Sequence, residues 1–386
     1  MRLFCFLIAI LPISLAAQSE FGVQAQLGGG YEYNPFNTGI SHPDSSSNAA
    51  IRSGAFQYTS LRMSWQQEWD NSELRTALHG QYFYFPGLKA ANLFRPGADL
   101  KYQFNFSEDA SLYTDLRYRA YQTERGVDPT AVLNIPASYR TYDGLLGDAF
   151  KPATNSSLQA ELHVRNKLFA SNRNSQLRYN RLGVRLEWKQ RFRTEGKPSG
   201  YLYASIDINQ RVYLEEELLL EEEFETFPEE EEEFEEEELE PEILSERIWR
   251  YQQFDLSYRF RKWDNLQLET GISLLNRTDV LQERLGYRQV QLITKLRYRN
   301  DRWSWSWNNS YTYRPYTQFD ADPEGEELLL HQYWRTSLTA TYQLSEEWQV
   351  FGRVSSVKRW RNQADQATTF LPYFNASGRV GIQFKI

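Results

Sequence analysis

A regular alternation of apolar and polar side chains runs along most of this chain and limits the folds it can adopt. In LRMSWQQEW, Leu61, Met63 and Trp65 alternate with polar residues. The same pattern recurs in DLKYQFNF from position 99 and in VQLITKLRYR from position 290. A period of two residues predicts strands with one apolar and one polar face. These segments run for about ten residues or more, whereas strands of soluble proteins are usually about 5–6 residues long.

Turn signals divide the chain into sixteen such segments, joined alternately by short turns and longer polar loops. The short turns are expected at 70–72, 107–109, 152–156, 195–199, 263–265, 300–302 and 345–347. The longer loops are expected near 32–53, 86–94, 124–138, 169–175, 214–247, 277–287, 315–331 and 361–370. An even number of long antiparallel strands, with short periplasmic turns and longer extracellular loops, is typical of a transmembrane β-barrel.

Two alternatives to the sixteen-stranded barrel stay open at this point. The alternation weakens over 138–151 and 176–192, so a barrel of fourteen strands is the fallback. A large soluble β-sandwich or solenoid is the second alternative, although its strands would be short and its apolar faces would need a complementary sheet. The all-β transmembrane barrel explains the pattern best.

The aromatic residues support a membrane-spanning barrel. Aromatic side chains make up 15% of the chain, which contains 11 Trp. Toward the periplasmic ends of the expected strands lie Trp65, Trp69, Trp188, Trp263, Trp303, Trp305, Trp307 and Trp348, and toward the extracellular ends lie Trp249, Trp334 and Trp360. This distribution predicts two aromatic girdles, one at each membrane interface.

Residues 1–17 have the pattern of a secretory signal peptide. Arg2 precedes an apolar run over 3–15, and Ala16 and Ala17 are small residues before Gln18. A buried N-terminal helix is the alternative, but the run is short and ends in small residues. The rest, 18–386, is expected to form one domain that lacks Cys and any transmembrane helix.

The last eight residues, Arg379 to Ile386, resemble the C-terminal targeting strand of Gram-negative outer-membrane β-barrel proteins. Gly381 and Phe384 occupy the Gly and first aromatic positions, and Ile386 stands where a final aromatic is usual. The resemblance implies a multi-pass protein of the cell outer membrane, in contact with the lipid bilayer and lipopolysaccharide. It also implies periplasmic chaperones and the barrel assembly machinery as partners. The class is porin-like, with neither a specific family nor an oligomeric state indicated.

The inward face follows from the outward one, because successive side chains of a strand alternate between faces. The main lumen-lining candidates are Lys101, Arg117, Arg119, Arg165, Arg185, Arg259, Lys295, Arg297, Arg335 and Arg353. The same parity points Lys167, Arg181, Lys189, Arg211, Arg261, Arg299 and Arg379 inward, together with the acids Asp99, Asp115, Glu161, Glu187, Asp207, Asp255 and Glu269.

Three functions are compatible with such a lumen. A basic, water-filled lumen predicts a channel or porin for small polar or anionic solutes. If the same side chains instead form ion-pair ladders that block the lumen, the protein is a non-conducting surface or scaffold barrel that binds partners through its loops. The third class is an outer-membrane enzyme. Because His79 and His163 lie four strands apart, without an obvious Ser or Asp constellation, no catalytic, cofactor or metal residue is predicted.

One stretch differs from the rest of the chain. Residues 215–246 hold nineteen Glu and neither Lys nor Arg. The rest of the chain has 32 acidic and 43 basic residues, so it is basic. This acidic low-complexity segment, 214–246, is expected on the extracellular side. Its negative charge argues against nucleic-acid binding. It is either a solvated tail, a diffuse Ca²⁺-binding loop, or a lid that folds back over the basic lumen.

Overall fold

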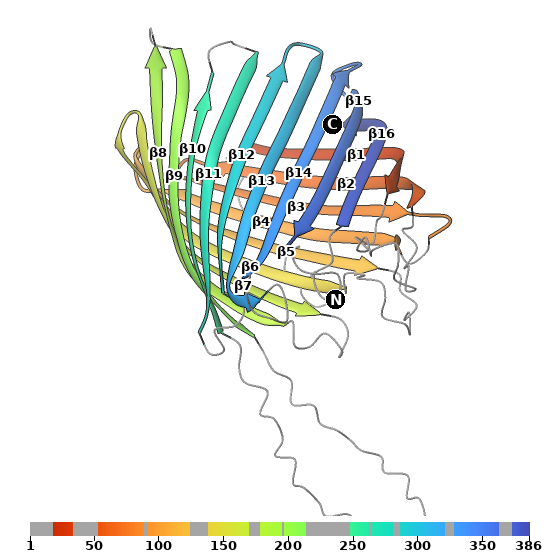
Figure 1. Cartoon of the computed structure of the whole chain (residues 1–386). Coiled ribbons are helices and arrows are strands. Elements are labelled where there is room, and N and C mark those ends of the chain that lie inside the picture. The colour runs from red at the N-terminus through yellow and green to blue at the C-terminus, as the bar shows by residue number, and fades with distance from the viewer. Residues whose placement is uncertain are drawn as a thin grey trace, which may run out of the picture.

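The computed structural model shows sixteen antiparallel strands that close into a barrel (Figure 1). It describes residues 18–33, 53–88, 91–123, 138–169, 178–194, 197–213, 248–261, 265–280, 286–320, 328–362 and 373–386. The predicted signal peptide and the acidic segment 214–246 lie outside these residues. The described part of the chain contains no helix with the length and apolarity needed to span a bilayer.

Each strand pairs with its neighbours in sequence, and β1 pairs with β16 to close the barrel. The strands are β1 (Gln18–Tyr33), β2 (Ser53–Trp69), β3 (Ser72–Tyr84), β4 (Leu93–Asn105), β5 (Ala110–Thr123), β6 (Tyr139–Ala153), β7 (Ser156–Phe169), β8 (Tyr179–Thr194), β9 (Lys197–Tyr213), β10 (Ile248–Phe260), β11 (Leu266–Asp279), β12 (Tyr287–Arg299), β13 (Trp303–Asp320), β14 (Leu328–Gln343), β15 (Trp348–Arg361) and β16 (Tyr373–Lys385).

The predicted strand count and the order of turns and loops are confirmed. Seven short connections lie at one end of the barrel, which we call the turn end, and eight connections lie at the opposite, loop end. The C-terminal residue also lies at the turn end, where Val23 and Ile386 exchange backbone hydrogen bonds of 3.0 Å. Strands β6 and β8 span the two segments with weak alternation, so the fallback of fourteen strands is wrong.

The outer face of the barrel is apolar. Large aliphatic side chains stand exposed along the middle of the strands, including Leu182 (56%), Leu292 (54%) and Val354 (62%). Exposed apolar surface on this scale is unstable in water and stable in lipid. Along most strands the outward apolar residues alternate with inward residues that are mainly polar or aromatic.

The tryptophans that the structure describes follow the predicted girdles with one exception, and Trp263 lies outside the described residues. Trp303, Trp307 and Trp348 are exposed on the outer face near the turn end, and Trp334 is exposed on it in the loop half of β14. Trp249 is different, because its ring lies 4.1 Å from the guanidinium carbon of Arg277 inside the barrel. It shares its interior face with Tyr251 on β10, so its assignment to the membrane girdle is wrong.

The closing seam between β1 and β16 is unusually close. Gly28 and Gly381 lie directly opposite each other across it. A Cβ atom on Gly381 would come within 2.4 Å of the Leu27 carbonyl oxygen and 2.9 Å of the Phe351 ring. The glycine of the C-terminal motif therefore has a structural reason, since a larger residue would push the two strands apart.

Candidate functional site

The interior of the barrel is the candidate site, and all ten main lumen-lining candidates face it. The register places each of them on the same face as neighbours that contact other interior side chains. Further inward cations are Arg62, Arg75, Arg95, Arg277, Arg314, Arg359 and Arg361. These seven were not predicted from the sequence, although the alternation along their own strands points them inward. The interior has two chemically different halves.

The turn half contains a cavity of about 920 Å³ between β4 and β12. Its lining holds seven carboxylates, Glu108, Asp109, Asp115, Glu161, Glu187, Asp255 and Glu269, and seven basic groups, Lys101, Arg117, Lys151, Lys189, Arg191, Arg259 and Lys295. The charges of this cavity therefore balance. The sequence predicted a basic lumen with fewer inward acids, and this half differs because acids and bases are equal in number around the cavity.

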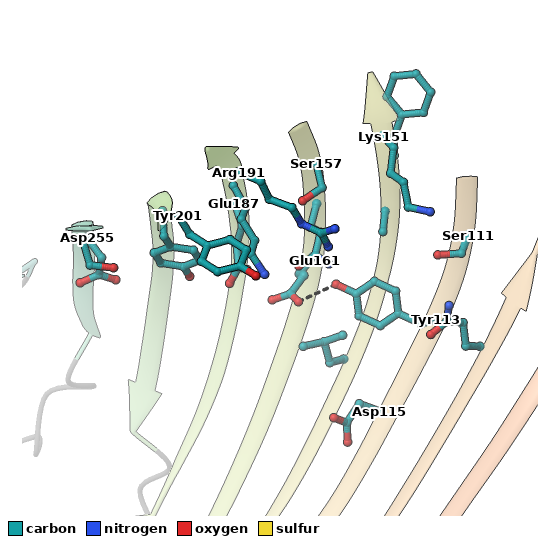
Figure 2. A pocket seen from close by; sticks show the side chains of 18 of the residues that line it. Ser111, Tyr113, Asp115, Lys151, Ser157, Glu161, Glu187, Arg191, Tyr201 and Asp255 are labelled. Atoms are coloured by element: carbon teal, nitrogen blue, oxygen red, sulfur yellow. Dashed lines mark hydrogen bonds between the residues drawn. The ribbon is translucent and has the colours of Figure 1, made fainter. Parts of the chain in front are cut away.

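Opposite charges in the turn half are bonded to each other. Arg259 and Lys295 both donate to Glu269, with Nη2 2.5 Å and Nζ 2.6 Å from its two carboxylate oxygens. The Tyr113 hydroxyl donates to Glu161 Oε1 over 2.6 Å, and Figure 2 shows this bond inside the cavity. Such pairs hold charged side chains against the inner wall of the barrel. The cavity beside them is therefore lined by polar groups.

The two interior histidines also have acidic partners. His163 Nε2 lies 3.2 Å from Asp207 Oδ2, and His79 Nδ1 lies 3.6 Å from Asp99 Oδ2. The sequence indicated no Asp constellation around either histidine, because both partners lie on other strands. Among the described residues, no group of three or more His, Cys, Asp or Glu is arranged to hold a metal ion. The diffuse Ca²⁺ site expected in the acidic segment falls outside the described residues.

The loop half is lined by cations that stack on aromatic rings. Eight basic side chains lie 4.0–5.5 Å from ring centroids of the same strand, a neighbouring strand or, for Arg379, the next strand but one: Arg95, Lys167, Arg211, Arg277, Arg314, Arg335, Arg359 and Arg379. We call this set the cation–ring belt. It continues around the inner wall from β4 to β16, with rings from the intervening strands.

Parts of the belt repeat one arrangement, in which a cation lies between two aromatic rings from the strands on either side. Arg211 lies between Tyr179 at 4.2 Å and Tyr251 at 4.7 Å, and Arg314 lies between Tyr287 at 4.5 Å and Tyr333 at 5.0 Å. Within the described part of the chain, no carboxylate lies within ion-pair distance of Arg95, Lys167, Arg211, Arg314, Arg335 or Arg379. Aromatic faces stabilise cations without neutralising them, so the loop half keeps positive charge.

Apolar side chains narrow the interior in two places. Phe56, Tyr58, Phe85 and Phe351 form one buried cluster, and Tyr287, Tyr316 and Leu329 form another. Residues buried inside a barrel of this size reduce the cross-section open to water. The inner wall therefore carries aromatic clusters at two places and charged groups elsewhere.

The closed barrel, the apolar outer face and the polar interior define a protein of the outer-membrane β-barrel class.

No protein-family model matches the sequence, and no curated protein matches it. Solved structures do match. The outer membrane channel DcaP of Acinetobacter baumannii aligns with a TM-score of 0.51 at 8% identity, covering 97% of this chain and 99% of that one. OccAB3 of the same organism aligns with a TM-score of 0.49 at 8% identity, covering 96% and 100%. Identity this low shows a shared fold alone.

Proposed function

We propose that this protein is an aqueous channel of the outer membrane that passes small polar solutes and favours anions. The observation that carries the proposal is the interior itself. It is lined by charged and hydroxyl groups and contains a cavity of about 920 Å³. Sixteen strands give a barrel wide enough for water, and its apolar outer face suits a bilayer.

The preference for anions rests on the cation–ring belt. The turn half balances its charges, whereas six belt cations stack on rings and have no carboxylate within ion-pair distance in the described structure. A positive ring along the permeation path lowers the energy of a passing anion and raises that of a cation. Selectivity is thus set in the loop half.

A swelling assay of proteoliposomes tests the proposal. Vesicles containing the purified protein are placed in isotonic arabinose, gluconate or a cationic sugar amine of similar size. We expect swelling in all three solutes, fastest in gluconate. Lack of swelling in any solute, with correctly inserted protein, would contradict the channel. Equal rates would contradict only the anion preference.

The two aromatic clusters favour a second candidate function. If Phe56, Tyr58, Phe351 and the ring of Tyr287 close the path, the barrel is a scaffold whose loops bind a partner. The same swelling assay separates this role from a channel, because a scaffold leaves the vesicles impermeable.

A further inference from the structure

Three arginines lie side by side on the interior wall. Arg165 of β7 is the direct cross-strand neighbour of Arg181 of β8, which is the direct neighbour of Arg211 of β9. All three side chains point into the barrel. Like charges placed directly opposite each other on paired strands destabilise the sheet, so the folded protein needs something that offsets this repulsion.

Carboxylates offset part of it. Arg165 donates a hydrogen bond from Nε to Asp143, and Arg181 Nη2 lies 3.5 Å from Asp207. Asp207 is shared, since it also lies 3.2 Å from His163 and accepts a hydrogen bond of 2.6 Å from Asn209. It therefore neutralises Arg181 only in part.

The remaining positive charge comes from Arg211 and from Lys167. Lys167 lies opposite Tyr179, two residues along β7 from Arg165, with Nζ 4.0 Å from the Tyr139 ring and 4.7 Å from the Phe169 ring. Arg165 and Arg211 both repel Lys167 electrostatically. The four cations thus share two nearby carboxylates, and aromatic rings hold the two cations that have none.

Donors in this row are also left unsatisfied. The Nε atoms of Arg181 and Arg211 are buried and have no hydrogen-bond partner among the described residues. A buried donor without an acceptor costs free energy. Next to Arg165 and Arg181 is a cavity of about 210 Å³. Its charged lining consists of Arg117, Arg165, Arg181 and Arg185 together with the carboxylates Asp115, Asp143, Glu161 and Asp207. The row thus has more cations than carboxylates, unused donors, and space beside two of its arginines.

We propose that Arg165, Arg181, Arg211 and Lys167 form a binding site for a compact polyanion, a solute with two or more carboxylate or phosphate groups. Such a solute supplies several acceptors at once and offsets the repulsion between the arginines. The site deepens the proposed channel function and rests on it, because it names the class of solute that is held on the way through the lumen.

Titration calorimetry on the purified full-length protein in detergent micelles tests the site. The probes are citrate and pyrophosphate, which separate carboxylate from phosphate ligands, with acetate as the monoanion. We expect both polyanions to bind, and acetate to bind at least about tenfold more weakly.

Arg211→Gln should weaken polyanion binding by about tenfold, and Lys167→Gln should weaken it as well without leaving a buried donor unpaired.

Arg250→Gln is the matched control. Arg250 lies near Arg211 at the loop end of the neighbouring strand, but it is exposed on the outer face of the barrel. The control removes the same charge and should leave binding unchanged. Unchanged affinity in both Arg211→Gln and Lys167→Gln, equal weakening in Arg250→Gln, or acetate binding as tight as citrate would each overturn the proposal.

Conductance in planar bilayers distinguishes failure of the site from failure of the channel. A protein that conducts chloride but binds neither polyanion is a channel without this site. A protein that binds polyanions in micelles but never conducts has the site and is not a channel.

Discussion

At the scale of single residues, one interior contact depends on a glycine, because the side chains of the two flanking strands meet over it. His163 of β7 and Asn209 of β9 flank Gly183 of β8 in register. A Cβ atom on Gly183 would lie 2.5 Å from His163 Cε1 and 2.4 Å from Asn209 Cβ. The contact between His163 and Asp207 therefore requires a residue without a side chain between them.

We expect Gly183→Ala to destabilise the folded barrel by about 1–3 kcal/mol, because His163 and Asn209 must both move. Denaturant unfolding in detergent, followed by the mobility shift between folded and unfolded barrel on a gel, measures the change. Gly378→Ala is the control, since an added Cβ there meets nothing within 4 Å. Equal stability of both variants would contradict the described packing around His163.

At the scale of elements, the sequence predicted the strands well and the pairing inside the barrel poorly. Alternation locates a strand whenever one face is consistently apolar. Strand β6 has a mixed pattern, because Leu145 lines the interior cavity while Asp148 lies on the opposite face. The same irregularity concealed Asp143, the partner of Arg165. Partners on other strands cannot be predicted from spacing, because the register decides which side chains meet.

The C-terminal strand β16 both closes the barrel and carries the proposed assembly signal. Phe384 faces outward at the turn end, where its ring packs 4.9 Å from that of Trp348. Gly381 allows the close seam with β1, and the backbone of Ile386 bonds to Val23. We propose that the assembly machinery and periplasmic chaperones recognise this strand before the barrel closes.

Phe384→Ser should slow insertion and leave the protein in the periplasm, because the terminal strand loses its aromatic. Cell fractionation and folded-protein levels in the outer membrane measure this effect. Phe21→Ser is the matched control, as Phe21 is an exposed aromatic at the turn end of the neighbouring strand β1. Normal outer-membrane levels of the Phe384 variant, or an equal loss in both, would remove the C-terminal motif as the signal.

At the scale of the whole molecule, charge is distributed unevenly along the barrel axis. The turn half pairs its charges, and the loop half keeps the cation–ring belt. The sequence indicated an excess of inward cations. It could not show that carboxylates balance the cations around the turn-half cavity but leave part of the excess in the loop half, since that depends on which strands come together. In the sequence, the nineteen Glu of 215–246 lie between β9 and β10, whose adjoining ends are at the loop end.

Replacing 214–246 with a short Gly-Ser bridge should shift ion selectivity further toward anions, because negative charge near the mouth repels them. The effect should shrink at high salt, where the Debye length falls to about 3 Å at 1 M. Reversal potentials at low and high ionic strength measure both changes. Identical selectivity with and without the segment would mean that its charge does not act on the permeation path.

An open, anion-favouring channel must conduct ions and must pass chloride faster than potassium. Single-channel recording of the purified full-length protein in a planar bilayer, under a gradient of KCl, measures both properties. We expect discrete conductance steps and a reversal potential whose sign shows that chloride permeates faster than potassium. A barrel that inserts without conducting, or one that favours potassium, would contradict this account.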